Sequence, residues 1–194
     1  MRGLYALKPW YTRQLDGVVR WAVRRSVSPD VFTWAGVLSA AAAAVAIAAG
    51  WWFVVLVLLA GRLAGANLDG AVARARGVSR PWGFVVNEVG DRASDLLMFA
   101  GLAVLLAREQ GTAGLVFVLV AAVVATLPTL ASLAGAGAGA PRLNGGPFGK
   151  TERCLAVVVL VAVPGLAPIL LPVIIALSLV TAGTRLRELR RLLA

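Results

Sequence analysis

Apolar residues in this chain occur in long blocks separated by short polar or basic connections. A helix needs about 20 mostly apolar residues to cross the hydrocarbon core of a bilayer, and five or six blocks approach that length. The fifth and sixth blocks are short and are joined by a Pro- and Gly-containing segment that suits a tight hairpin. The pattern predicts an all-α bundle of six membrane-spanning helices, at residues 33–50, 51–73, 84–107, 113–135, 153–165 and 167–184.

The residues before the first block follow a different pattern. Between residues 4 and 22, apolar residues recur at steps of three and four, with Lys and Arg between them. This is typical of an amphipathic helix in the membrane interface, with Trp10 and Tyr11 at headgroup level. Ser28 and Pro29 then favour the start of the first span. We expect one membrane domain over 1–194: an interfacial helix at 1–27, the six-span bundle at 28–184 and a basic tail at 185–194.

Basic residues indicate the orientation. The chain has 19 Lys and Arg against 9 Asp and Glu, a net charge of +10. With six spans, the basic connections and both termini fall on one side of the membrane, and only Arg108 falls on the other. The positive-inside rule then predicts an integral protein of a bacterial-type cytoplasmic membrane, with both termini cytoplasmic. Orientation and anionic headgroups explain the charge, so we expect membrane lipids and no nucleic acid as partners.

Ionisable residues inside the second and third blocks are the strongest functional signal. Charged residues at membrane depth cost roughly 2.5–3.5 kcal/mol each on insertion scales, so they are functional candidates. Helical rise puts Asp69 and Asp91 at matching depth, about 26–27 Å from the outer ends of their helices. Arg62 and Asp95 lie about 16 and 20 Å deep by the same arithmetic, and we expect them to form a buried ion pair.

The residues beside Asp69 indicate a phosphate-bearing ligand. Ala66, Gly70 and Ala73 form a stripe of small residues, which lets a large ligand approach the backbone closely. Arg74 supplies positive charge. Oxygen ligands without His or Cys point to magnesium, calcium or manganese and not to zinc.

This spacing resembles the signature of the CDP-alcohol phosphotransferase family, also called CDP-alcohol phosphatidyltransferases. The family's pattern is Asp-x-x-Asp-Gly-x-x-Ala-Arg, about eight residues, then Gly-x-x-x-Asp-x-x-x-Asp. Two of its four Asp positions are replaced here, the first by Ala66 and the third by Asn87, which makes the chain a divergent member. The resemblance covers essentially the whole chain, and six signature positions match: Asp69, Gly70, Ala73, Arg74, Gly83 and Asp91.

The resemblance implies an enzyme of phospholipid biosynthesis at the cytoplasmic face. It would transfer a phosphatidyl or related lipid phosphate group from a CDP-linked donor such as CDP-diacylglycerol to an alcohol, with release of CMP. The cofactor would be Mg²⁺ or Mn²⁺, as one or two ions. Asp91 would be the catalytic base. The metal ligands would be Asp69, Asn87 and Asp91, and CDP would lie against Asp69, Gly70, Ala73, Arg74 and Gly83.

Basic residues between the fourth and fifth spans are the candidates for binding the acceptor alcohol. Lys150, Arg153 and Arg142 are the candidates for binding the acceptor, and ordinary positive-inside anchoring is the alternative for all three. Family members often dimerise, so the resemblance leaves a homodimer open.

Two other functions fit parts of the pattern. The two missing carboxylates favour a catalytically impaired family member that binds nucleotide or lipid, or stabilises a partner protein in the membrane. A transporter or channel would need polar residues through the whole membrane, whereas here they stop about halfway across. We rank that function last.

Overall fold

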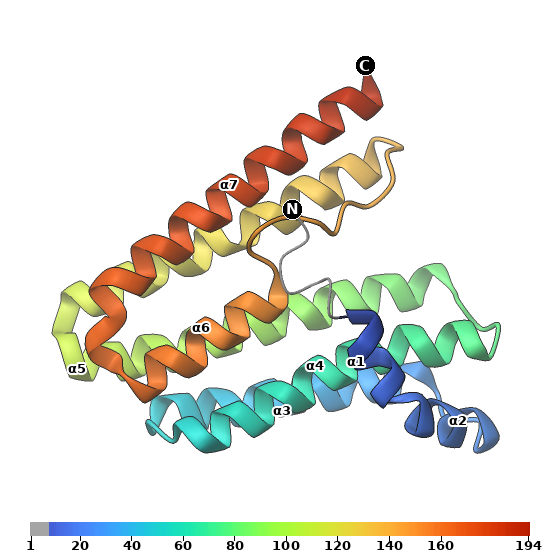
Figure 1. Cartoon of the computed structure of the whole chain (residues 1–194), viewed down its shortest axis with the longest axis horizontal. Helices are drawn as coiled ribbons and strands as arrows, with labels where there is room; N and C mark the ends of the chain where they lie inside the picture. Colours follow the sequence, from blue (N-terminus) through green and yellow to red (C-terminus); the bar gives the residue numbers. More distant parts are fainter. Residues whose placement is uncertain (1–7) are drawn as a thin grey trace. The chain divides into compact units, whose positions relative to one another are not determined.

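The computed structural model describes residues 8–194 (Figure 1), which divide into two compact units, residues 8–102 and residues 103–194. We call them the amino-terminal and the carboxy-terminal unit. The described residues form helices and connections, with no β-strand, so the all-α prediction is confirmed. The elements are α1 (Lys8–Gln14), α2 (Asp16–Arg24), α3 (Pro29–Ala48), α4 (Trp52–Ala75), α5 (Pro81–Gly137), α6 (Lys150–Ala162), η2 (Pro164–Leu166) and α7 (Ala167–Leu193).

The basic segment before the first span forms two short helices, α1 and α2, where the sequence pattern predicted one helix over 1–27. The part of that prediction at residues 1–7 lies outside the described residues. Trp10 and Trp21 are exposed, while Ala22 on α2 is fully buried. Both helices pack on α4, and the Tyr11 hydroxyl donates to the Ala60 carbonyl at 3.3 Å. The segment is therefore amphipathic, as expected.

The ends of α3 and α4 follow capping rules. Ser28 is the N-cap of α3 and accepts a hydrogen bond from the Asp30 amide at 3.4 Å, with Pro29 in the first turn. Both helices then end at a glycine with positive φ, Gly50 after α3 and Gly77 after α4. In each case the next amide bonds back to a carbonyl five residues earlier, which is the Schellman arrangement. The first span therefore begins about four residues before the predicted position 33.

Backbone contacts hold the helices of the amino-terminal unit together. A Cβ at Gly65 on α4 would lie 2.6 Å from the Phe32 carbonyl oxygen and 2.9 Å from Gly36 Cα, both on α3. A Cβ at Gly101 on α5 would collide with the Ala44 carbonyl oxygen on α3. Such close approach is how membrane helices associate where burial from water offers no driving force. It fixes α3 and α4 side by side along the polar stretch of α4 (Figure 1).

The predicted third and fourth spans form one long element, α5, of 57 residues. Its helix is broken at Gly111, where φ is 64° and ψ is −151°, and the chain turns back at this point (Figure 1). Positive φ is accessible to glycine at little cost, so Gly111 makes the turn without a separate loop. The predicted gap at 108–112 is therefore a single-residue break.

The number of spans differs from the prediction. Within residues 8–194, four helical stretches are long and apolar enough to cross a membrane: Pro29–Ala48, Trp52–Ala75, Pro81–Gly137 and Pro164–Leu193. The third stretch contains two helical segments, because the helix is broken at Gly111. Helix α6 has 13 residues, fewer than the 18 required of a candidate span. These helices support an integral membrane protein, and the count of six is not confirmed.

The predicted tail at 185–194 is the end of α7, which runs to Leu193. Arg, Leu and Glu are strong helix formers, so nothing in this sequence stops the helix at the membrane boundary. Arg185 also fixes it locally, donating to the Gly145 carbonyl at 2.9 Å and to the Pro128 carbonyl at 2.6 Å. The tail is thus a mostly exposed continuation of α7, with Leu189 buried against the carboxy-terminal unit.

Candidate functional site

A pocket lies among α3, α4 and the first part of α5, within the amino-terminal unit. It contains about 210 Å³ of empty space, counting the part open to solvent. Asp69 and Asp91, expected at matching depth, both line it. Its other polar side chains are Thr33, Arg62, Asn87 and Ser94, and apolar or small residues at Gly36, Val37, Ala66 and Gly90 complete the wall.

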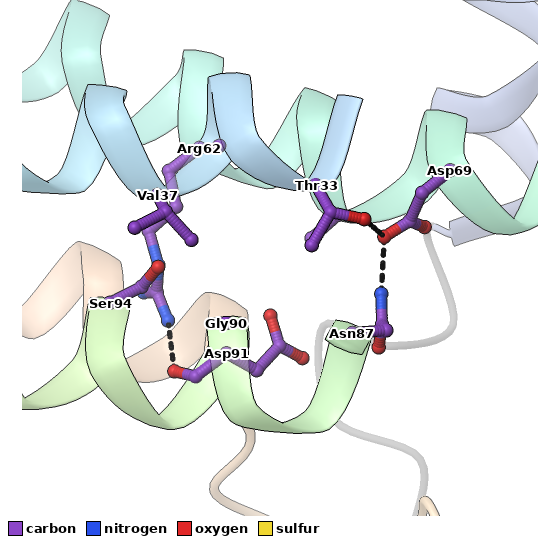
Figure 2. Close-up of a pocket in the computed structure, with 10 residues that line it drawn as sticks. Thr33, Val37, Arg62, Asp69, Asn87, Gly90, Asp91 and Ser94 are labelled. Atoms are coloured by element: carbon purple, nitrogen blue, oxygen red, sulfur yellow. Dashed lines mark hydrogen bonds between the residues drawn. The ribbon is translucent and has the colours of Figure 1, made fainter. Parts of the chain in front are cut away.

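Asp69, on α4, is held by donors from the two neighbouring helices. Thr33 Oγ1 on α3 donates to Asp69 Oδ2 at 2.9 Å, and Asn87 Nδ2 on α5 donates to the same oxygen (Figure 2). The other carboxylate oxygen accepts from the Gly70 amide. Asp69 is 6% exposed, and a carboxylate this buried needs such donors to offset its lost hydration.

Asn87 takes part in the site as a donor. Its amide nitrogen faces Asp69, whereas the resemblance assigned its carbonyl oxygen to a metal. The nitrogen and oxygen of an amide exchange places on rotation about the Cβ–Cγ bond. Ligation by Asn87 therefore requires that rotation, which would remove one donor from Asp69. Asn67, next to the signature, bonds to the Leu63 carbonyl of its own helix at 2.7 Å and does not line the pocket.

Arg62 and Asp91 both line the pocket, from α4 and from α5. The Asp91 carboxylate points into the pocket from α5, and the Arg62 side chain reaches from α4 toward α5 (Figure 2). Arg62 Nη2 donates to Asp95 Oδ1 at 2.6 Å and lies 3.5 Å from the Asp91 carbonyl oxygen. The ion pair expected between Arg62 and Asp95 is therefore present, with side chains only 1% and 5% exposed.

Asp95 has a second cationic partner. Arg92 Nη1 lies 2.8 Å from Asp95 Oδ2, so each carboxylate oxygen faces a different guanidinium group. An unpaired charge in a membrane interior is costly, and here both carboxylate oxygens of Asp95 have a guanidinium partner. Asp95 thus pairs with two arginines and does not line the pocket itself.

The proposed CDP-binding residues lie around the end of α4. The Arg74 side chain covers Gly70, since a Cβ at Gly70 would lie 3.1 Å from Arg74 Nη1. A Cβ at Gly83 would lie 3.4 Å from Arg80 Cγ, an ordinary contact. Ala73 is half-buried, and its carbonyl accepts the capping bond from Val78. Arg74 is exposed and so is accessible to an anionic ligand.

The three candidate acceptor-binding residues belong to the carboxy-terminal unit. Arg142 Nη1 donates to Asn144 Oδ1 at 2.9 Å, Lys150 begins α6, and Arg153 is buried in its first turn. These contacts describe local structure only. Acceptor binding by Lys150, Arg153 and Arg142 stays a prediction.

Sequence reasoning missed two polar residues of the pocket. Thr33 and Ser94 are 8% and 2% exposed, and Thr33 bonds directly to Asp69. Thr33 stands four residues into an otherwise apolar helix, one of the few polar positions there. That position was the available signal, although hydroxyl side chains are common in membrane helices and carry little information alone.

Comparison with known proteins gives a structural likeness. No protein-family model and no curated protein matches the chain. The crystal structure of Mycobacterium tuberculosis phosphatidylinositol phosphate synthase (PgsA1) with CDP-DAG bound matches with a TM-score of 0.78 at 24% identity, over 91% of this chain and 94% of that one. Its complex with manganese and citrate gives 0.77 at 24% identity over 90% and 88%, and its apo form 0.74 at 23% over 90% and 95%. The chain therefore has the fold of this CDP-alcohol phosphatidyltransferase.

Proposed function

We propose that the chain is a phosphatidyltransferase-type enzyme of the CDP-alcohol phosphotransferase family. It transfers a phosphatidyl or related lipid phosphate group from a CDP-linked lipid to an alcohol, and it releases CMP. The observation that carries the proposal is the pocket lined by both remaining signature carboxylates, Asp69 and Asp91. The fold supports it, since the matched synthase binds CDP-DAG, which suggests the same donor here.

The donor would bind beside α4 through its diphosphate. The Arg74 guanidinium lies over Gly70, where a Cβ would crowd it at 3.1 Å, so the glycine leaves room for the arginine that would meet the diphosphate. Arginine matches phosphate geometry with two parallel donors, so Arg74 suits a diphosphate better than a lysine would. Asp69 stays oriented by Thr33 and Asn87 at the edge of this surface.

Asp91 is the proposed general base. Its carboxylate points into the pocket, and a base must reach the proton that it removes. The acceptor hydroxyl attacks the phosphorus next to the lipid, its proton passes to Asp91, and the bond from that phosphorus to the CMP oxygen breaks. The new phosphate ester is the lipid product, and CMP leaves.

The oxygen donors of the pocket fit one divalent ion. Mg²⁺ is typically bound by one or two carboxylates together with phosphate oxygens and water, and Asp69 and Asp91 supply two carboxylates. Described residues 8–194 contain no cluster of three or more His, Cys, Asp or Glu side chains. When bound, Mg²⁺ or Mn²⁺ would neutralise charge that develops on the transferred phosphate. In this proposal the site lies at the cytoplasmic face of the membrane and both termini are cytoplasmic. Dimer formation by two copies of the chain stays an expectation from the family resemblance.

The proposal is tested with the purified full-length protein in detergent or vesicles. CDP-diacylglycerol is supplied with Mg²⁺ or Mn²⁺ and a panel of alcohols that includes phosphorylated ones, and free CMP is measured. We expect CMP release with at least one alcohol, abolished by a chelator. A folded, monodisperse protein that releases no CMP with any alcohol in the panel would contradict the proposal.

The second candidate function is an impaired family member that binds nucleotide or lipid, or stabilises a partner. The donation of the Asn87 amide to Asp69 favours it, because this bond satisfies the carboxylate without a metal. It predicts that Asp91→Asn preserves function in cells, whereas the enzyme proposal predicts loss. Complementation of a deletion strain by the two forms separates the candidates.

A further inference from the structure

Arg62 is the cationic side chain that this part of the chain places in the wall of the pocket. It is 1% exposed and is fixed by Asp95 on the adjacent helix, at 2.6 Å. Its Nη2 also lies 3.5 Å from the backbone carbonyl of Asp91. The guanidinium is therefore held in the wall of the pocket, next to the backbone of the residue that carries the proposed catalytic carboxylate.

Ala66 lies one helical turn after Arg62 and lines the same pocket. It occupies the position where the signature has its first Asp. Gly36 packs against this turn, since a Cβ there would lie 3.4 Å from the Arg62 carbonyl oxygen and 3.7 Å from the Ala66 amide. Next to Arg62, the pocket is therefore lined by the Ala66 methyl group and by backbone, and not by the carboxylate that a second metal ion would need.

The charges of the cluster leave room for one divalent ion. Asp95 faces two arginines, Arg62 and Arg92, and these three groups together carry one positive charge. Asp69 and Asp91 add two negative charges, so the whole cluster has a net charge of −1 before any ion binds. One divalent ion at the two carboxylates brings it to +1. A second would add two further positive charges close to a buried guanidinium.

Resting on the proposed function, we infer that Arg62 is a built-in cation that takes the place of a second divalent ion. The site therefore binds one divalent ion, at Asp69 and Asp91. The guanidinium supplies positive charge beside the reacting phosphate without leaving the site.

The ion number is measured with Mn²⁺ alone and the purified full-length chain, without substrates. Free Mn²⁺ is followed by electron paramagnetic resonance during titration, which gives the number bound per chain. The inference predicts one ion, with affinity reduced more than about tenfold in Asp69→Asn. Two ions, no ion, or unchanged affinity in Asp69→Asn would overturn it. Glu109→Gln, an exposed carboxylate on the other unit, is the matched control and should bind as the wild type does.

Two variants test the role of Arg62 itself. Ala66→Asp restores the signature carboxylate, but the new group should pair with Arg62, so the count stays at one. Arg62→Met combined with Ala66→Asp removes that partner, and the count should rise to two. Asp95 keeps Arg92 in this double variant, which supports folding. If the double variant is not monodisperse, Ala66→Asp alone decides: one ion supports the inference and two overturn it.

The ion count tests the role of Arg62, and the CMP assay tests the proposed function, so either claim can be contradicted without the other. Two ions together with CMP release would overturn the role of Arg62 and leave the proposed function standing. One ion without CMP release from any alcohol would leave the ion count standing and contradict the function.

Discussion

The Thr33 hydroxyl on α3 donates a hydrogen bond of 2.9 Å to Asp69 Oδ2 on α4, and both side chains are buried. This bond joins the first membrane-spanning helix to the signature carboxylate. It also limits how Asp69 can rotate, because the same oxygen accepts from Asn87 on α5. One carboxylate oxygen thus links three helices at the pocket.

Replacing Thr33 with Val keeps the shape of the side chain and removes this donor. A hydrogen bond to a charged group contributes about 1.5–3 kcal/mol, so we expect a loss of stability in that range. CMP release should fall with it, because Asp69 loses its fixed orientation. The measurements are the thermal unfolding midpoint in detergent and the initial rate.

Thr126→Val is the control for this change. Thr126 bonds only within its own helix, to the Val123 carbonyl at 2.6 Å, so its loss should shift the midpoint little. Equal shifts for the two variants would show that the Thr33 bond contributes nothing beyond the loss of a hydroxyl.

The ion pairs of Asp95 predict that replacing Asp95 costs more stability than replacing its partner Arg62. Asp95→Ala removes the carboxylate that pairs with two guanidinium groups, one of them buried. It should lower the free energy of unfolding by about 3–5 kcal/mol. Arg62→Met should cost less, because Asp95 keeps Arg92. The double variant should be more stable than the sum of the two losses predicts. Free energies of unfolding from a double-mutant cycle measure this coupling, and strictly additive losses would contradict it.

Gly65 sets the approach of α3 and α4 beside the pocket. In Gly65→Ala the new Cβ would meet the Phe32 carbonyl at 2.6 Å, so the helices must separate. We expect a loss of about 2–3 kcal/mol, together with weaker Mn²⁺ binding. Gly183→Ala, with open space around it, should instead stabilise α7 by about 0.5–1 kcal/mol. Two substitutions with the same sign and size would argue against backbone contact at Gly65.

The orientation in the membrane is tested by cysteine labelling. In a Cys154→Ser background, Ser79→Cys and Glu109→Cys place exposed thiols in the connection before α5 and next to its break. A membrane-impermeant maleimide should label Glu109→Cys on intact cells, and Ser79→Cys only after permeabilisation. The reverse pattern would place the pocket on the opposite face of the membrane.

Local rules predicted the parts of the fold that local interactions decide. Ser28 and Pro29 marked the start of α3, because capping depends on neighbouring residues. The pairing of Arg62 with Asp95 was predictable because two charges in adjacent spans have few other partners at that depth.

The remaining features depend on contacts between distant residues. The second partner of Asp95, Arg92, could not be predicted, since the sequence does not show which way its side chain turns. The bond from Thr33 to Asp69 spans 36 positions. The continuation of α7 past 184 was missed because charge marks the edge of a membrane but does not end a helix.

The central claim is that Asp69 and Asp91 act together as the reaction site. The most direct measurement is the rate of CMP release from CDP-diacylglycerol by the wild type, Asp91→Asn, Asp69→Asn and Glu109→Gln, with each protein shown to be folded. We predict release by the wild type and Glu109→Gln, and a loss of at least about a hundredfold in the other two. Equal rates in all four proteins would contradict the claim.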